Sequence, residues 1–477
     1  YNFEVYGYLA SNGAEGDSIR ITSGPANQQQ QADQWQGINF WNESNDNSYL
    51  QYTIIEYAYD GVYSNWSSQN FMHSTFYENS RHGVYLNRSD GSVINDCTFD
   101  DNNSTGLYLE YSSASSTGCD FTNNSSWGLQ LWDYCKLVID DALIENSNSG
   151  IRSHDQSDLQ LSNSTIRNIS DNGIYFNDAY NRGDVTGCHF ENCDYGIYLY
   201  YRSHPLIKGN TFVDNNSGIQ IYYQCDSEIS DNVFIANSNG IRFDNSGYYC
   251  QNTISGNIFA YQSNDGIHKN GYNNTYNSDP VIVNNTFFGN GGDGIQIAAF
   301  GTDVIKNNII SDNGNYGINL SQPAEVIENN TIYANAAGEI SDLNNAPVET
   351  WNFVSVNPNN NATCDIYRNI NEDPMFNLSD TLDLTLQAAS KCIDGGAEDI
   401  KDPDGSISDI GALPFDQGNP HRIWTTGYGD QSVSLAWQEV SNDSLIEYNV
   451  YYKDTEAEAD YVLFGSTGNT SIDVTGL

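Results

Sequence analysis

The stretch GIYLYYRSHPLIKGNTFVDNNSGIQIYYQCDSEISDNVFIANSNGIRF, residues 196–243, holds one pattern twice and begins it a third time. Each unit opens with a glycine followed by isoleucine, at Gly196, Gly218 and Gly240, 22 residues apart. Each unit also contains Asn-x-Phe, at Asn210 and Asn232. Self-similarity at a fixed period of about 20 to 50 residues is the mark of stacked repeats, so the stretch predicts a solenoid.

The pattern extends well beyond this stretch in both directions. Glycine followed by Ile, Val or Leu recurs at intervals of 22 to 28 residues, at Gly61, Gly83, Gly106, Gly128, Gly150, Gly173, Gly196, Gly218, Gly240, Gly266, Gly294 and Gly317. We expect the glycine to supply a positive φ or a tight corner before each strand. Only the units from Gly240 to Gly266 and from Gly266 to Gly294 are clearly longer, by four and six residues.

Each unit consists of short alternating segments separated by Asn, Asp, Ser and Gly, which is a β pattern. In Gly196–Tyr200, Ile197 and Leu199 would point inward and the tyrosines outward. We predict an all-β, three-sided parallel β-helix of about 22 residues per coil. Phe212, Phe234 and Phe259 would stack in its core, and the asparagines of the Asn-x-Phe triplets would form a ladder along the axis.

The composition argues against nucleic-acid binding, membrane insertion and disorder. Lys and Arg number 17 against 62 Asp and Glu, which gives a formal net charge of -45. Such a field repels nucleic acid and anionic membranes. No apolar run is long enough to span a bilayer. Disorder is not expected, because aromatic residues make up 13% of the chain and apolar residues recur at fixed intervals. The chain starts at Tyr1 without a signal peptide, so we expect a processed or truncated protein.

Two regions resemble one known family. The strands expected at 17–23, 35–40 and 50–57 resemble the opening coils of secreted right-handed parallel β-helix proteins of the pectate lyase-like superfold. Four later segments, at 371–376, 382–386, 392–396 and 402–412, resemble the closing part of the same family. The resemblance covers roughly residues 1 to 415. It implies coils over 1–337, a closing segment and cap over 338–418, and export. It does not fix an activity, since the family includes polysaccharide lyases, hydrolases and non-enzymes.

The last segment, 419–477, follows an apparent linker at Asn419-Pro420. The runs Ser432–Trp437, Tyr448–Tyr452 and Ser471–Leu477 resemble the first strands of a fibronectin type III domain. Trp437 would be the core tryptophan of a partial β-sandwich.

Cysteine spacing and carboxylate spacing predict two further features. The nine cysteines indicate an oxidising compartment. Because neighbouring coils bring Cα atoms within disulfide range, we expect bonded or closely stacked pairs, namely Cys97 with Cys119, Cys225 with Cys250, and Cys364 with Cys392. Asp402, Asp404 and Asp409 alternate around Gly405 as calcium ligands do, and a plain capping turn is the alternative. Sequons such as Asn103 and Asn124 would permit glycosylation.

The outward positions of the strand after each glycine offer the best surface for ligands. Aromatic side chains there could stack on sugar rings, or could simply stabilise the sheet across strands. They are Tyr85, Tyr108, Trp132, Tyr175, Tyr198, Tyr200 and Tyr222. Lyases of the resembling family use Lys, Arg or His to abstract a proton, and the candidates here are Arg152, His154, Arg242, Asp244, His268 and Lys269. Arg152 and His154 lie four coils, ~19 Å, from the other four residues, which is too far for one catalytic site. A glycoside hydrolase would need two carboxylates close together, and Glu110 has no second carboxylate near it on this face. No catalytic set is therefore complete.

Two functions fit this pattern. The first is an extracellular structural or adhesive rod that assembles end to end with copies of itself, with its first coil covered by a neighbour. The second is a polysaccharide-active enzyme or carbohydrate-binding module that uses the tyrosine-rich face. The uninterrupted coils and the incomplete catalytic set favour the rod.

Overall fold

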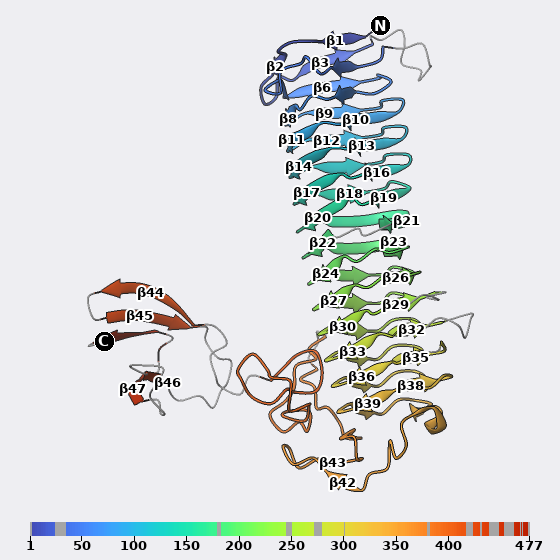
Figure 1. The fold of residues 1–477 in the computed structure, drawn as a ribbon, viewed down its shortest axis with the longest axis vertical. Helices are drawn as coiled ribbons and strands as arrows, with labels where there is room; N and C mark the ends of the chain where they lie inside the picture. Colours follow the sequence, from blue (N-terminus) through green and yellow to red (C-terminus); the bar gives the residue numbers. More distant parts are fainter. Residues whose placement is uncertain are drawn as a thin grey trace.

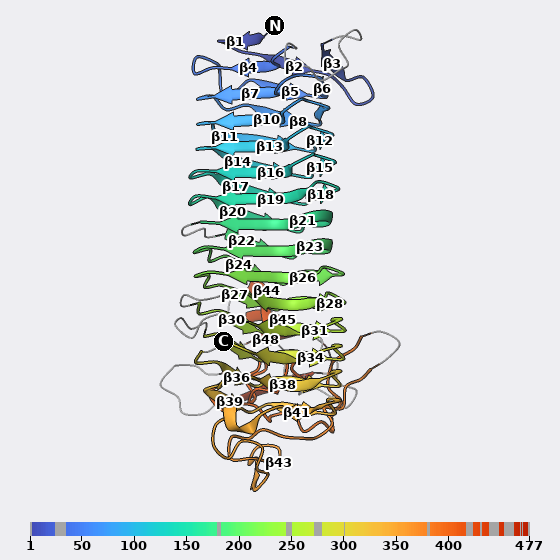
Figure 2. The same cartoon turned by 90° about the vertical axis from the view of Figure 1, so that its right-hand side faces the viewer.

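The protein is a rod of stacked β-coils (Figure 1). The computed structural model describes residues 2–23, 35–178, 183–244, 250–270, 279–299, 301–378 and 382–415, and beyond them 423–429, 432–437, 448–452, 462–467, 469 and 471–475. Each coil contributes one strand to each of three faces, and all pairing between coils is parallel. Strands of one face therefore lie directly above one another (Figure 2). The all-β parallel β-helix predicted from the sequence is confirmed.

Face 1 carries the strand that contains or follows the recurrent glycine. Its strands are β1 (Phe3–Val5), β4 (Ile38–Phe40), β7 (Val62–Asn65), β10 (His82–Asn87), β13 (Thr105–Glu110), β16 (Trp127–Trp132), β19 (Ser149–His154), the second halves of β21 (Thr165–Asn177) and β23 (His189–Tyr200), β26 (Ser217–Tyr222), β29 (Asn239–Phe243), β32 (Ile267–Lys269), β35 (Ile295–Ile297), β38 (Tyr316–Leu320) and β41 (Gly338–Ile340).

Faces 2 and 3 complete each coil. Face 2 carries the Phe or Ile position, in β3 (Ile19–Thr22), β6 (Thr53–Glu56), β9 (Thr75–Tyr77), β12 (Thr98–Asp100), β15 (Asp120–Thr122), β18 (Leu143–Glu145), the first halves of β21 and β23, β25 (Thr211–Val213), β28 (Val233–Ile235), β31 (Ile258–Ala260), β34 (Thr286–Phe288), β37 (Ile309–Ser311) and β40 (Thr331–Tyr333). Face 3 is β2 (Ala10–Asn12), β5 (Tyr49–Gln51), β8 (Asn70–Met72), β11 (Asp90–Asn95), β14 (Ser113–Thr117), β17 (Lys136–Asp140), β20 (Asp158–Ser162), β22 (Gly183–Thr186), β24 (Leu206–Lys208), β27 (Glu228–Ser230), β30 (Thr253–Ser255), β33 (Val281–Val283), β36 (Val304–Lys306) and β39 (Val326–Glu328).

The core is a column of stacked rings beside a column of amides. Phe212 and Phe234 lie with ring centroids 4.8 Å apart and nearly parallel, and Phe234 and Phe259 follow at 4.7 Å. At the adjoining corner the Asn232 amide donates to Oδ1 of Asn257 at 2.9 Å, and this bond repeats from coil to coil. The predicted stacking and the predicted asparagine ladder are both confirmed.

The recurrent glycine has a different role from the one expected. None of the twelve has a positive φ; the glycine lies inside a strand or directly before one. A Cβ on Gly240 would lie 2.5 Å from Cδ1 of Phe259 and 2.6 Å from the carbonyl oxygen of Gly266. The residue is therefore glycine because the core phenylalanine and the next coil approach its backbone closely.

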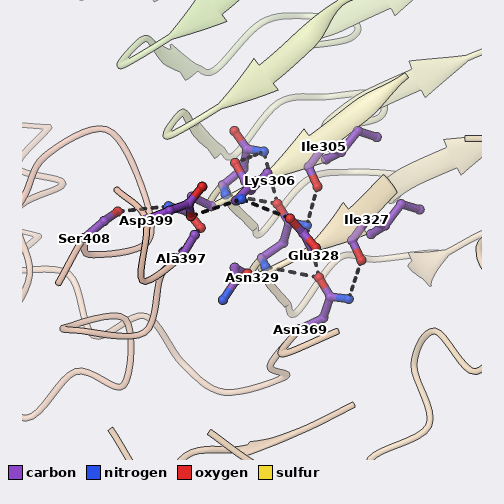
Figure 3. Close-up of polar contacts among 12 residues, drawn as sticks. Ile305, Lys306, Ile327, Glu328, Asn329, Asn369, Ala397, Asp399 and Ser408 are labelled. Atoms are coloured by element: carbon purple, nitrogen blue, oxygen red, sulfur yellow. Dashed lines mark hydrogen bonds and ion pairs between the residues drawn. The ribbon is translucent and has the colours of Figure 1, made fainter. Parts of the chain in front are cut away.

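The closing segment folds back on the last coils and forms a second small core. Phe288 and Ile309, which face outward from face 2, are buried there against Ile370, Phe376 and Leu386. Its remaining short elements are a 3-10 turn (Leu343–Asn345), β42 (Ser355–Val356) and β43 (Thr363–Cys364). Figure 3 shows its polar attachment to face 3: Lys306 lies 3.0 Å from a carboxylate oxygen of Glu328 and 3.5 Å from one of Asp399.

Five antiparallel strands follow toward the C-terminus. They are β44 (Ile423–Gly429), β45 (Ser432–Trp437), β46 (Tyr448–Tyr452), β47 (Val462–Thr467) and β48 (Ser471–Thr475). β44, β45 and β48 form one sheet and β46 pairs with β47. Strands thus occur where they were expected, while a fibronectin-like module stays a prediction. The linker predicted at Asn419-Pro420 lies outside the described residues.

Candidate active site on face 1

The predicted aromatic residues all lie on face 1 and project outward. Tyr85 and Tyr108 pair edge to face at 4.9 Å, while Tyr200 and Tyr222 stack nearly parallel at 5.3 Å. The others occupy equivalent positions, at Trp132, Tyr175 and Tyr198. Rings that stack along the axis turn their edges to solvent, so cross-strand stabilisation explains the parallel pairs well.

A cationic cluster lies in the middle of face 1. The imidazole of His154 stacks on Trp132 at 4.3 Å, and the Arg152 guanidinium lies 4.4 Å from the centroid of the same tryptophan. Nδ1 of His154 also lies 2.7 Å from Oδ2 of Asp155. Burial first, and the nearby Arg152 second, lower the pKa of His154. This imidazole therefore lies between an aromatic ring and a carboxylate.

A second cluster lies on and beside β29 and β32. Its geometry suits proton transfer better than that of the cluster at His154. Nδ1 of His268 lies 2.7 Å from Oδ2 of Asp265, whose side chain is only 6% exposed. Arg242 is the register partner of His268 on the preceding coil, and its Nε lies 2.9 Å from Oδ2 of Asp244. The buried carboxylate thus fixes the imidazole through one nitrogen and leaves Nε2 for a ligand.

Sequence reasoning missed Asp265 and the aspartate that follows it one coil later, Asp293. Both precede the recurrent glycine, a position that was not counted among the outward ones. Asp293 donates its backbone amide to Oδ1 of Asp265 at 2.7 Å, and its own carboxylate accepts from the side chains of Asn315 and Asn319. Burial raises the pKa of Asp293. The available signal was Asp-Gly at 265–266 and 293–294, where the two preceding coils have Ser-Gly and Asn-Gly and the following coil has Tyr-Gly.

Lys269 is not part of this surface, and its inclusion among the catalytic candidates was wrong. Strand alternation points it into the core beside Phe243, where it is fully buried. Its Nζ donates to both carboxylate oxygens of Asp303, at 2.6 and 2.8 Å. Burial lowers the pKa of Lys269 and raises that of Asp303 to about 6. The pair links two coils from within.

All nine cysteines are buried, and no disulfide joins them in the structure. The backbone amide of Cys97 donates to Sγ of Cys119 at 3.3 Å, and Cys225 donates likewise to Cys250 at 3.2 Å. These pairs occupy equivalent sites on adjacent coils. Cys364 and Cys392 lie in the second core, where Cys392 contacts the hydroxyl of Thr331. Of the two arrangements expected for the pairs, Cys97 with Cys119 and Cys225 with Cys250 show close stacking without a bond.

The carboxylates predicted to bind calcium cap turns of the closing segment. Asp402 accepts from the backbone amide of Asp409 at 2.8 Å, and Asp404 accepts from that of Ser406 at 2.9 Å. Asp409 accepts from two further amides, and burial raises its pKa to about 7. Across the described ranges, no three His, Cys, Asp or Glu side chains converge to hold a metal ion. The capping role is the one that this geometry supports.

The cluster at His268 can therefore transfer a proton. A histidine oriented by a buried carboxylate is a common general base or acid, since the carboxylate fixes the tautomer and stabilises the imidazolium. Arg242 adds a positive charge one coil away, where it could face a developing negative charge. The two longer coils adjoin this cluster, and their added residues lie largely at 245–249 and 271–278, outside the described part of the chain.

Two family models match the chain. The model described as "Right handed beta helix region" matches residues 136–277 and 267–369, and the one described as "Periplasmic copper-binding protein (NosD)" matches residues 11–185. A search of curated protein sequences returns no match. None of the described residues forms a helix that could cross a lipid bilayer.

Solved β-helix structures are similar at low sequence identity. A GH87 α-1,3-glucanase from Streptomyces thermodiastaticus is 11% identical with a TM-score of 0.36, over 72% of this chain and 63% of the glucanase. The periplasmic alginate epimerase AlgG, as a double mutant, is 12% identical with a TM-score of 0.38, over 72% and 78%. The tailspike of Escherichia coli bacteriophage HK620 is 12% identical with a TM-score of 0.33, over 71% and 66%. Together with the stacked coils, the family models identify the chain as a right-handed parallel β-helix repeat protein.

Proposed function

We propose that this protein acts on a polysaccharide outside the cytoplasm, with His268 as the proton-transferring residue. The observation that carries the proposal is the contact between His268 Nδ1 and the buried Asp265 carboxylate, on an open face of a straight rod. A polysaccharide laid along face 1 would meet Nε2 of this histidine and the guanidinium of Arg242 together.

The sequence alone favoured a structural rod because no catalytic set was complete. That argument weakens once Asp265 is placed beside His268, since the histidine then has the orienting partner that was missing. End-to-end assembly stays a separate prediction. Copper, named in the description of the NosD family model, is not part of the proposal, because no three suitable ligands converge in the described residues.

Product analysis tests the proposal. The full chain is incubated with neutral and acidic polysaccharides, and unsaturated or new reducing ends are measured. We expect products from at least one polysaccharide, and a loss of roughly 100-fold or more in His268→Ala, the size typical of a lost general base.

The matched control is His189→Ala, since His189 lies on β23 with its side chain 41% exposed and away from the cluster. It should retain the activity of the unchanged protein. Absence of product from every polysaccharide, or full activity in His268→Ala, would contradict the proposal.

A further inference from the structure

A separate hollow lies at the corner between face 1 and face 3 in the early coils. It has a volume of about 410 Å³ and is lined by Asp46, Trp66, Ser68, Arg88, Asp90 and Tyr111. Trp66, Arg88 and Tyr111 directly follow β7, β10 and β13, so they occupy the same corner position on three successive coils. None of them belongs to the cluster at His268, which lies nine coils from Trp66 and seven from Tyr111, ~34 to 43 Å along the axis.

The three corner residues form a sandwich that remains open to solvent. The Arg88 guanidinium lies 5.4 Å from the ring centroid of Trp66 and 5.0 Å from that of Tyr111. Trp66 is 58% exposed and Tyr111 is 38% exposed, so both keep much of their surface in contact with water. Exposed aromatic surface held in place by a cation is preorganised for a partner with an apolar ring face.

Backbone conformation makes this choice of residues costly. Trp66, Arg88 and Tyr111 have φ values of 59°, 50° and 48°, in the left-handed region that favours Gly, Asn and Asp. At the corner between face 3 and face 2, the equivalent left-handed positions are mostly Asn, Asp or Gly, such as Asn163 and Gly187. At the same corner of later coils Tyr201 and Tyr223 are left-handed too, so the backbone cost of a large side chain is met at several coils and the open aromatic surface is what distinguishes this hollow.

The polar lining indicates what the ligand is. One Asp46 oxygen accepts the backbone amide of Ser68 at 2.9 Å, which orients this carboxylate beside the Trp66 ring. Asp90 adds a second carboxylate against the single guanidinium of Arg88, so the hollow carries a net negative formal charge. Carboxylates accept hydrogen bonds from hydroxyl groups and repel anionic substituents. We propose that this hollow binds a neutral, hydroxyl-rich sugar ring, stacked on Trp66, as an anchoring site apart from the active site.

The size of the hollow agrees with such a ligand, since small-molecule sites usually enclose about 300 to 1,000 Å³. The inference rests on the proposed function only in sharing a polysaccharide ligand. Binding at this site needs no turnover, and it can therefore be measured in the His268→Ala variant.

The test is a titration of the full-length His268→Ala chain with neutral gluco-, manno- and xylo-oligosaccharides and with oligouronates, by calorimetry. We expect at least one neutral oligosaccharide to bind. Adding Trp66→Asn should raise its Kd at least tenfold, which is about 1.4 kcal/mol. The same change should leave Tm equal or higher, because Asn tolerates the left-handed backbone. A structural tryptophan would instead lower Tm.

The matched control is Tyr261→Asn, since Tyr261 is also left-handed, with φ of 58°, and 48% exposed, but lies at another corner. It should leave binding unchanged. Unaltered affinity in Trp66→Asn, binding of oligouronates alone, or no binding of any neutral oligosaccharide would overturn the anchoring site. The active site would still be judged by its own products.

Discussion

At the residue scale, position along the coil decides what each side chain does. Asn257 shows this well: it is fully buried, accepts from the amide of Asn232, and donates to the backbone carbonyl of Ile229 at 2.9 Å and to Asn285. An isolated buried asparagine would destabilise the fold because its amide would lack hydrogen-bond partners. In the ladder each side-chain amide supplies a hydrogen-bond partner to the next. The same logic holds for Asp265, whose buried carboxylate is satisfied by His268 and a backbone amide.

Removing one side chain from the asparagine ladder should lower the free energy of unfolding substantially. In Asn257→Ala the amides of Asn232 and the carbonyl of Ile229 lose their partner without access to water. At about 1 to 3 kcal/mol for each stranded group, we expect the free energy of unfolding to fall by roughly 3 kcal/mol or more. Denaturant titration measures this change. Asn103→Ala, at an exposed corner, should change stability by less than about 0.5 kcal/mol. Equal effects of the two changes would contradict the ladder's role.

At the element scale, the corners differ more than the strands. The inward positions of face 1 are mostly aliphatic from coil to coil, while the corner after these strands varies. It carries Trp66, Arg88 and Tyr111 in early coils, then three aspartates, and then Tyr201 and Tyr223. Asp133, Asp155 and Asp178 follow β16, β19 and β21 in that column. Burial, and then hydrogen bonds shared with the other two aspartates, raise the pKa of Asp155 to about 6.

This aspartate column makes stability depend on pH. The folded pKa of Asp155, about 6, lies above its ordinary 3.8, so protons bind the folded state more tightly. The stabilisation is complete below about 3.8 and is lost as pH rises through about 6. Asp155→Asn should therefore raise Tm at pH 8, with a smaller gain at pH 5, while His154 and Arg152 beside it stay in place. Thermal scans at both values measure this difference. Asp214→Asn, at an exposed corner elsewhere, is the control, and a Tm gain that is larger at pH 5 would refute the assignment.

At the scale of the whole molecule, the rod holds two surfaces at a fixed separation, the anchoring hollow and the His268 cluster. The anchoring hollow lies in the early coils, the His268 cluster lies near the later, longer ones, and the closing segment covers part of face 2. A long ligand could contact both surfaces without any movement of the protein, because the coils between them form one continuous sheet. This separation explains why binding and chemistry can be tested independently.

Much of this was predictable from the sequence, and the exceptions have physical causes. The period placed Phe212 and Asn232 correctly because every coil repeats the same local packing. It could not show that Gly240 avoids a clash with Phe259, nor that Lys269 finds Asp303 inside the core, since both depend on contacts between coils. Asp265 was missed because outward positions were counted only after the glycine. The hollow at Trp66 was missed because corner positions were treated as turns.

The most direct test is a crystal structure of the His268→Ala variant with an oligosaccharide that the unchanged protein degrades. We predict a sugar lying across β29, β32 and β35, with a reacting atom about 3 Å from the site that Nε2 of His268 would occupy and with Arg242 in contact. An oligosaccharide bound with no contact to β29 or β32 would contradict the account, even if the hollow at Trp66 were filled.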